Sequence, residues 1–222
     1  MNKIIKPVDW GLVEYNQAWK EQESIFAETI SRKIQELETE NYLIFCEHPH
    51  VYTLGKSGDE QNLLLNYIQL QANNAQFVHT NRGGDITYHG PGQIVGYPIF
   101  DLANFGIGLK EYINRIEASI IELLQQYNIR SERLEGATGV WLDTGTKQAR
   151  KICAIGVRSS RYVTMHGFAL NINTDLAYFG HINPCGFTDK GVTSLEQELG
   201  EKQDMNKVKA ALLEIFQKKF SI

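Results

Sequence analysis

The sequence lacks the features that mark secreted, disulfide-bonded and membrane-spanning proteins. Its 222 residues include three cysteines, and the positions of Cys46, Cys153 and Cys185 fit neither a disulfide framework nor a zinc-binding spacing. No apolar run is long enough to span a bilayer. Residues 1–9 lack the apolar core and the small-residue cleavage site of a signal peptide. We therefore expect a cytoplasmic protein whose cysteines stay reduced.

An excess of charge of either sign is also lacking. The chain has 22 lysines and arginines against 26 aspartates and glutamates, a net charge of −4 at pH 7. This balance gives no general attraction for nucleic acid or for an anionic membrane surface. With 42% hydrophobic and 22% charged residues, the composition is ordinary for a globular protein. The length suits one large domain or two small ones, and we expect a single domain over residues 1–222.

What the sequence does have is a glycine-rich stretch followed by a strongly apolar one. Residues 82–93 contain four glycines and a proline, which disfavour both a helix and an ordinary strand. Residues 94–100 are apolar and β-branched, and they predict a buried strand. A loop that leads into such a strand can bring peptide N–H groups, Arg82 and His89 close to a ligand. A glycine-rich hairpin with a solvated arginine is the alternative that composition leaves open.

Periodicity elsewhere predicts a mixture of helices and strands. Apolar residues at three- and four-residue steps predict amphipathic helices over residues 15–37 and 109–127, and a last helix after Asp204. The polar residues 144–150 read as the tip of a hairpin. Short apolar runs predict strands at residues 42–46, 132–134, 139–143, 152–158 and 167–173. This mixture predicts an α+β fold built around one sheet.

Two histidines flank Pro49, and a metal site is one interpretation of them. No carboxylate or cysteine lies at a supporting distance in the sequence from His48 and His50. We therefore expect loop histidines and no metal.

Lys151 and Cys185 are candidates for chemistry, although each has an ordinary explanation. Lys151 opens an apolar segment and could simply mark a solvated strand end. Cys185 lies in a turn between a proline and a glycine, whereas Cys46 lies within an apolar run. Exposure and a nearby cation are what make a thiolate reactive. An idle surface thiol or a packed one is the alternative for Cys185.

Several segments together resemble a known family. Residues 82–93, 151–156, 166–173 and 183–186, in this order and spacing, are similar to those of the octanoyltransferases of lipoate synthesis, the lipoate-protein ligase B family. Residues 47–55 resemble the family's early motif as well, and the likeness runs from about residue 42 to about residue 199. Cys153 departs from the pattern, since alanine is expected there, and it suggests a second thiol near the site.

The resemblance implies an α+β fold like the catalytic domain of lipoate and biotin protein ligases, with a mixed β-sheet flanked by helices. It implies an enzyme that moves an octanoyl group from octanoyl-acyl carrier protein to a lysine of apo lipoyl domains. These domains belong to 2-oxoacid dehydrogenase complexes and to the glycine cleavage H protein. Cys185 is then the nucleophile, carrying the octanoyl group as a thioester, and Lys151 is its partner. No cofactor is implied.

The resemblance also implies which residues line the acyl site. They are Arg82, Gly83, Gly84, Asp85, Ile86, Thr87, Tyr88, His89, Ala154, Ile155, Gly156, Gly167, Phe168 and Ala169. Residue chemistry agrees, because a cysteine thioester lets two bulky protein substrates visit in turn. Lys151 beside Cys185 favours the thiolate and can later take a proton from the attacking amine. Backbone N–H groups at Gly83 and Gly84, or around Cys185, could bind the oxyanion.

Side-chain size suggests how the octanoyl chain is held. Tyr88, Ile155 and Phe168 are expected as apolar walls of the slot. Gly156 and Ala169 are expected to leave room for the chain.

An acidic carrier protein needs a basic patch, since the whole chain is slightly acidic. Arg150, Arg158 and Arg161 are the candidates because they flank the strand of the expected site.

Two other functions stay open at this point. An ATP-dependent lipoate-protein ligase shares the fold and a lysine of this kind, and a non-catalytic carrier-binding protein could keep the fold and the glycine-rich loop. Cys185 with Lys151 favours the transferase, since a carrier-binding protein has no use for a thiol there. The glycines lack the lysine and hydroxyl spacing of a Walker-type phosphate loop.

Overall fold

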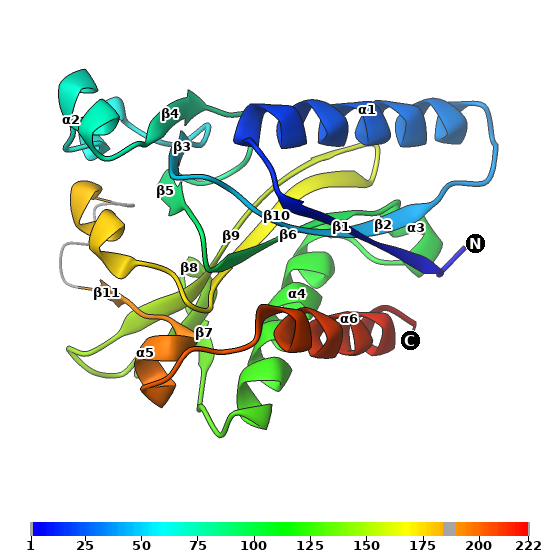
Figure 1. Cartoon of the computed structure of the whole chain (residues 1–222). Coiled ribbons are helices and arrows are strands. Elements are labelled where there is room, and N and C mark those ends of the chain that lie inside the picture. Colours follow the sequence, from blue (N-terminus) through cyan, green and yellow to red (C-terminus); the bar gives the residue numbers. More distant parts are fainter. Residues whose placement is uncertain (1, 184–189, 222) are drawn as a thin grey trace.

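The computed structural model describes residues 2–183 and 190–221, so Cys185 lies outside the described residues. Figure 1 shows how the helices and strands are arranged. Most strands belong to one large mixed sheet. Its order is β1 (Ile5–Leu12), β2 (Asn41–Glu47), β6 (Gln93–Ile99), β10 (Val163–Asn171), β9 (Arg150–Ser160), β8 (Ala137–Leu142) and β7 (Glu132–Leu134). A short strand, β11 (Gly191–Val192), pairs in parallel with β9.

Long helices cover both faces of this sheet (Figure 1). On one face lies α1 (Tyr15–Ile34), where Ala18 packs with β2 and β6 and Phe26 packs with β10. On the other face, α4 (Leu109–Gln126) and α6 (Met205–Ser221) cover the largest apolar core. The three helices predicted from periodicity are therefore confirmed to within a few residues at their ends.

A second, smaller sheet corrects the expectation of one sheet. Its order is β4 (Gln76–His79), β3 (Val51–Leu54) and β5 (Ile86–His89). Three short helices flank it, namely η1 (Glu60–Asn62), α2 (Tyr67–Ala72) and η2 (Leu176–His181). The glycine-rich stretch is thus not a loop throughout, because its middle forms β5. Composition hid this strand, since β5 pairs with β3, more than thirty residues away.

The predicted strands of the large sheet are confirmed, and β9 is longer than predicted at both ends because β8, β10 and β11 all pair with it. The polar residues 144–150 do connect the antiparallel strands β8 and β9. Sequence patterns missed β1, in which only Ile5 is buried. Val8, Trp10 and Leu12 do alternate in this strand, but Pro7 and Gly11 lie in the same segment, and both residue types are depleted in strands. Two further short helices are α3 (Leu102–Phe105) and α5 (Leu195–Leu199).

Candidate active site

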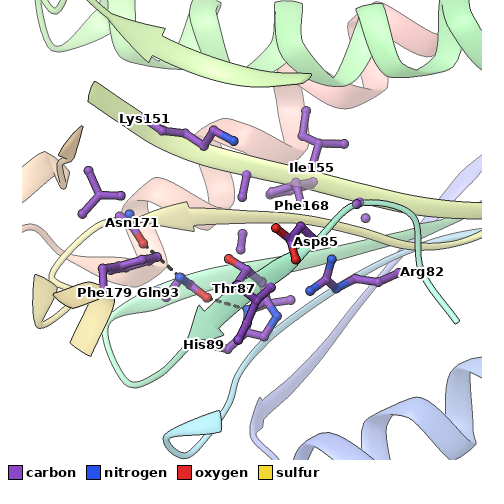
Figure 2. Close-up of a pocket in the computed structure, with 18 of the residues that line it drawn as sticks. Arg82, Asp85, Thr87, His89, Gln93, Lys151, Ile155, Phe168, Asn171 and Phe179 are labelled. Atoms are coloured by element: carbon purple, nitrogen blue, oxygen red, sulfur yellow. Dashed lines mark hydrogen bonds between the residues drawn. The ribbon is translucent and has the colours of Figure 1, made fainter. Parts of the chain in front are cut away.

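A cavity of about 120 Å³ lies between β9 and β10 of the large sheet and the segment 82–89 (Figure 2). It brings together the three groups of residues that the sequence predicted for the acyl site. The predicted residues that line it are Arg82, Gly84, Asp85, Ile86, Thr87, His89, Ala154, Ile155, Gly156, Gly167, Phe168 and Ala169, together with Lys151. Segments far apart in the chain thus meet at one cavity.

Gly83 and Tyr88 do not line the cavity. The Gly83 N–H donates to the Val157 carbonyl at 3.0 Å, so this peptide ties the loop to β9 and is not available to an oxyanion. Tyr88 packs in the core of the small sheet, with its ring centroid 4.9 Å from that of Tyr178 and its hydroxyl 2.7 Å from His50 Nδ1. The expectation that Tyr88 forms a wall is wrong, because its side chain lies in the core of the small sheet.

Gly156 serves the loop more than the acyl chain. A Cβ at this position would lie 2.7 Å from the Gly83 carbonyl oxygen and 3.3 Å from Arg82 Cδ. The space that a side chain would take is therefore filled by the backbone of residues 82–84, which corrects the expectation that Gly156 leaves room for substrate. Gly167 is similar, because a Cβ there would meet the Gly96 carbonyl at 2.0 Å and push β6 and β10 apart.

The Gly156→Ala variant should accordingly lose stability. The added methyl must displace the 82–84 backbone and break the Gly83–Val157 hydrogen bond, an overpacking effect of about 1–3 kcal/mol. Thermal unfolding would measure it, with Gly145→Ala as the control, because a Cβ at Gly145 meets nothing within 4 Å. An unchanged melting temperature with an altered acyl-chain preference would favour the role first expected for Gly156.

A β-bulge turns Lys151 into the cavity. The register of β8 and β9 pairs Val140 with Cys153 and Trp141 with Lys151, so Ile152 is an extra residue on β9. Ile152 and Cys153 both pack in the core beneath α4 and α6. In a regular strand Lys151 would share the face of Cys153 and point into that core. The extra residue reverses the alternation and places Lys151 on the cavity side, a known use of bulges.

Lys151 lies beside an aromatic ring at this end of the cavity. Its Nζ lies 4.6 Å from the centre of the Trp141 ring. Residues 190–192, which follow the undescribed segment 184–189, line the same cavity, and Val192 pairs with Lys151. Lys151 therefore does more than end a strand in solvent, which was its ordinary explanation. Cys185 itself is outside the described residues.

The end of the cavity beyond Gly156 is polar. Arg82 is 7% exposed, and its guanidinium donates to the Thr53 carbonyl at 2.5 Å and to the Gly83 carbonyl at 3.0 Å. This excludes the alternative of a solvated arginine on a simple hairpin. His166 Nε2 donates to Asn81 Oδ1 at 2.6 Å, and burial, followed by the Arg82 charge, lowers the pKa of His166 to about 3.

The two histidines around Pro49 follow β2, as expected of loop histidines, but His48 is fully buried. Its Nδ1 donates to the Val13 carbonyl at 2.7 Å, and its Nε2 accepts from the Tyr97 hydroxyl at 2.6 Å. Burial lowers the pKa of His48 to about 4. Within residues 2–183 and 190–221, no three histidine, cysteine or acidic side chains are grouped as a metal site requires.

The two described cysteines are poor nucleophiles. Cys46 and Cys153 have no exposed surface, and burial raises the pKa of each thiol well above its ordinary value. Cys153 packs in the apolar core with Val140 and Leu170, so it is not a second thiol in the cavity, as its neighbourhood in sequence suggested.

Two of the three arginines that are candidates for a basic patch are paired with carboxylates. Arg150 begins β9 and pairs with Glu198 at 2.7 Å and with Asp143. Arg158 lies toward the other end of β9 and pairs with Glu23 at 2.8 Å. The two lie eight positions apart on β9, about 26 Å along an extended strand. Arg161 follows the end of β9, and a basic patch that binds the acidic carrier stays a prediction.

Sequence patterns missed several residues of the cavity wall. Gln93 ends the glycine-rich stretch, and Asn171 is a polar residue within an apolar strand. Each position was a signal in the sequence that could have indicated a residue of the cavity. The aromatic members belong to helical or strand patterns that predict only core. The full set is Tyr15, Gln93, Val95, Tyr97, Trp141, His166, Asn171, Phe179, Lys190, Gly191 and Val192.

Comparison with known proteins identifies the family. The family model described as the lipoyl protein ligase A/B catalytic domain matches residues 14–217. An octanoyltransferase of Christiangramia forsetii is 55% identical over 99% of this chain and 97% of its own. An octanoyltransferase of Bacteroides fragilis is 58% identical over 92% of both. A structure of a bi-partite lipoate protein ligase and its E2 lipoyl domain from Thermoplasma acidophilum has a TM-score of 0.72 at 13% identity, covering 98% of this chain and 84% of that chain.

The chain thus belongs to the lipoyl protein ligase A/B catalytic domain family, and its fold is that of lipoate and biotin protein ligases. Its relatives above half identity are named octanoyltransferases, and the chain is accordingly a transferase that acts in octanoyl transfer for lipoylation. None of the helices in the described ranges has the length and apolar composition needed to cross a membrane.

Proposed function

We propose that this enzyme takes an octanoyl group from octanoyl-acyl carrier protein and delivers it to a lysine of apo lipoyl domains, through a thioester on Cys185. The single observation that carries the proposal is that Lys151 and residues 190–192 line one cavity. Lys190 follows Cys185 by five residues, so the thiol belongs to a segment whose far end already lies at this cavity. Burial of Cys46 and Cys153 leaves Cys185 as the candidate nucleophile.

The first step exchanges one thioester for another. Lys151 holds the proton of the Cys185 thiol, and the resulting thiolate attacks the thioester carbonyl of the donor. The tetrahedral intermediate collapses as the bond to the carrier sulfur breaks, and the ammonium of Lys151 returns its proton to that leaving thiolate. Octanoyl-Cys185, free carrier thiol and neutral Lys151 result, with no net change in protons.

The second step forms an amide. The acceptor lysine attacks the Cys185 thioester as a neutral amine, and Lys151 takes the proton that the new amide nitrogen loses. The bond to the Cys185 sulfur breaks, and the ammonium of Lys151 returns that proton to the sulfur, which regenerates the thiol and neutral Lys151. A thioester is an activated acyl donor, so neither step needs a nucleotide or a metal.

The cavity suits an acyl chain over most of its length. Ala154 and Ala169 are paired on β9 and β10 and line it with small apolar groups, and Val95 of β6 adds another. We propose that the octanoyl chain runs from Lys151 over these residues toward Gly156. The acceptors are proposed to be lipoyl domains of 2-oxoacid dehydrogenase complexes and the glycine cleavage H protein.

A donor experiment separates the transferase from the ligase. The protein should octanoylate an apo lipoyl domain from carrier-bound octanoate without ATP, because the donor thioester is already activated. A second reaction supplies free octanoate with Mg-ATP, and the mass of the lipoyl domain is measured in both. Product only in the second reaction would identify a ligase and contradict the proposal. Carrier binding without product in either would indicate the non-catalytic alternative.

A further inference from the structure

Four of the residues that line the cavity belong, with Thr53, to a single chain of buried hydrogen bonds. Arg82 Nη2 donates to Thr53 Oγ1 at 2.9 Å, and Thr53 Oγ1 lies 3.4 Å from His89 Nε2. His89 Nδ1 lies 2.8 Å from Gln93 Oε1, and Gln93 Nε2 donates to Asn171 Oδ1 at 2.9 Å. Figure 2 shows the links from His89 through Gln93 to Asn171. All five side chains are buried.

Chemistry fixes the direction of every link. Arg82 can only donate, so the Thr53 hydroxyl accepts from it and directs its own proton to His89 Nε2. The Gln93 amide oxygen can only accept, so His89 carries its proton on Nδ1. Burial lowers the pKa of His89, which keeps the ring in this neutral form. The chain is therefore polarised in one direction, from Arg82 toward Asn171, and such chains are strengthened by cooperativity.

The chain of hydrogen bonds ends at the backbone beside Lys151. Asn171 Nδ2 donates to the Thr193 carbonyl at 3.0 Å, while the Thr193 N–H donates to the Lys151 carbonyl at 2.9 Å. Thr193 directly follows the two-residue strand β11, which forms few ladder bonds of its own. Asn171 thus fixes the point where the chain that follows Cys185 joins the strand that carries Lys151.

We propose that Asn171 and Gln93 are positioning residues for Lys151, because they hold Thr193, whose N–H is bonded to the Lys151 carbonyl, in place at this end of the cavity. This inference rests on the proposed function, because the placement of Lys151 is given a purpose only by thiolate formation and proton transfer. Neither residue acts on substrate in this role. If Asn171 were lost, β11 would keep its backbone pairing but not its side-chain anchor, and small displacements at a reacting pair reduce rates strongly.

The test uses Asn171→Leu. Leucine is uncharged and close to asparagine in size, so the substitution removes the hydrogen bonds without adding a charge. The single-turnover rate of octanoyl-thioester formation at saturating carrier should fall about 10²-fold, with little change in KM. The rate of iodoacetamide alkylation is measured against pH, and its midpoint should move to higher pH because Lys151 favours the thiolate less. Buried Cys46 and Cys153 do not contribute to alkylation of the folded protein.

Asn104→Leu is the matched control. Asn104 is also a buried amide, and it donates to Thr39 Oγ1 at 2.9 Å, but it does not line the cavity. It should lower the melting temperature while leaving the alkylation profile unchanged. Gln93→Met removes the preceding link and should shift the profile in the same direction, and the double variant should lose less than the two single losses combined. Gln93→Met also tests the inference if Asn171→Leu does not fold.

The outcomes distinguish failure of the proposed function from failure of the positioning role. If wild-type protein forms no thioester on Cys185, the proposed function fails. The wild-type protein could form the thioester while the folded Asn171 and Gln93 variants keep the wild-type alkylation profile and transfer rate. That result would overturn the positioning role, and the buried hydrogen bonds would then only stabilise the fold.

Discussion

Incubation of the protein with octanoyl-acyl carrier protein should add one octanoyl group to Cys185. Intact mass would show the adduct, peptide mapping would locate it, and neutral hydroxylamine should release it as expected of a thioester. Cys46 and Cys153 should stay unmodified because both are fully buried and burial raises the pKa of both thiols. The Cys185→Ser variant should form no thioester and lose transfer to the lipoyl domain.

Cys153→Ala is the control for this result. It restores the residue expected in the family, and it removes a thiol that packs in the apolar core away from the cavity. The variant should form the adduct as the wild-type protein does, with at most a modest loss of stability. An octanoyl group mapped to Cys46 or Cys153 would contradict the assignment of Cys185.

Replacing Lys151 should have the second large effect. Lys151→Met keeps a long apolar side chain but removes the cation, so it should lower the rate of thiol alkylation at neutral pH and shift the profile to higher pH. Turnover should fall by about 10²- to 10⁴-fold, the range for loss of a general acid and base. Lys147→Met is the control, since Lys147 is exposed in the β8–β9 connection.

Lys151→Arg separates charge from proton transfer. An arginine still carries a positive charge near the thiol but stays protonated, so it cannot accept a proton from the attacking amine. Alkylation should then be affected less than in Lys151→Met, while octanoyl transfer to the acceptor stays low. Wild-type turnover in either variant would reduce Lys151 to a structural residue.

Local patterns predicted those parts of the fold that depend on one segment at a time. The periodicity of α1, α4 and α6 was sufficient because each helix buries one face, and the apolar runs of β2, β6 and β10 were sufficient because these strands are buried on both faces. Motif order also predicted most residues that line the cavity. It failed for Tyr88, because β5 pairs with β3 in a separate small sheet and Tyr88 packs in the core of that sheet.

What the sequence by itself determined about this protein is its three long helices, most strands of the large sheet and the segments that meet at the cavity. Only the tertiary structure decided how the side chains face. The β-bulge at Ile152 turns the Lys151 side chain from the core to the cavity. It depends on the register in which β8 and β9 pair. The anchoring of Thr193 by Asn171 and Lys151 likewise depends on three strands meeting. Such hydrogen bonds join residues far apart in the chain, and no local pattern of side chains encodes them.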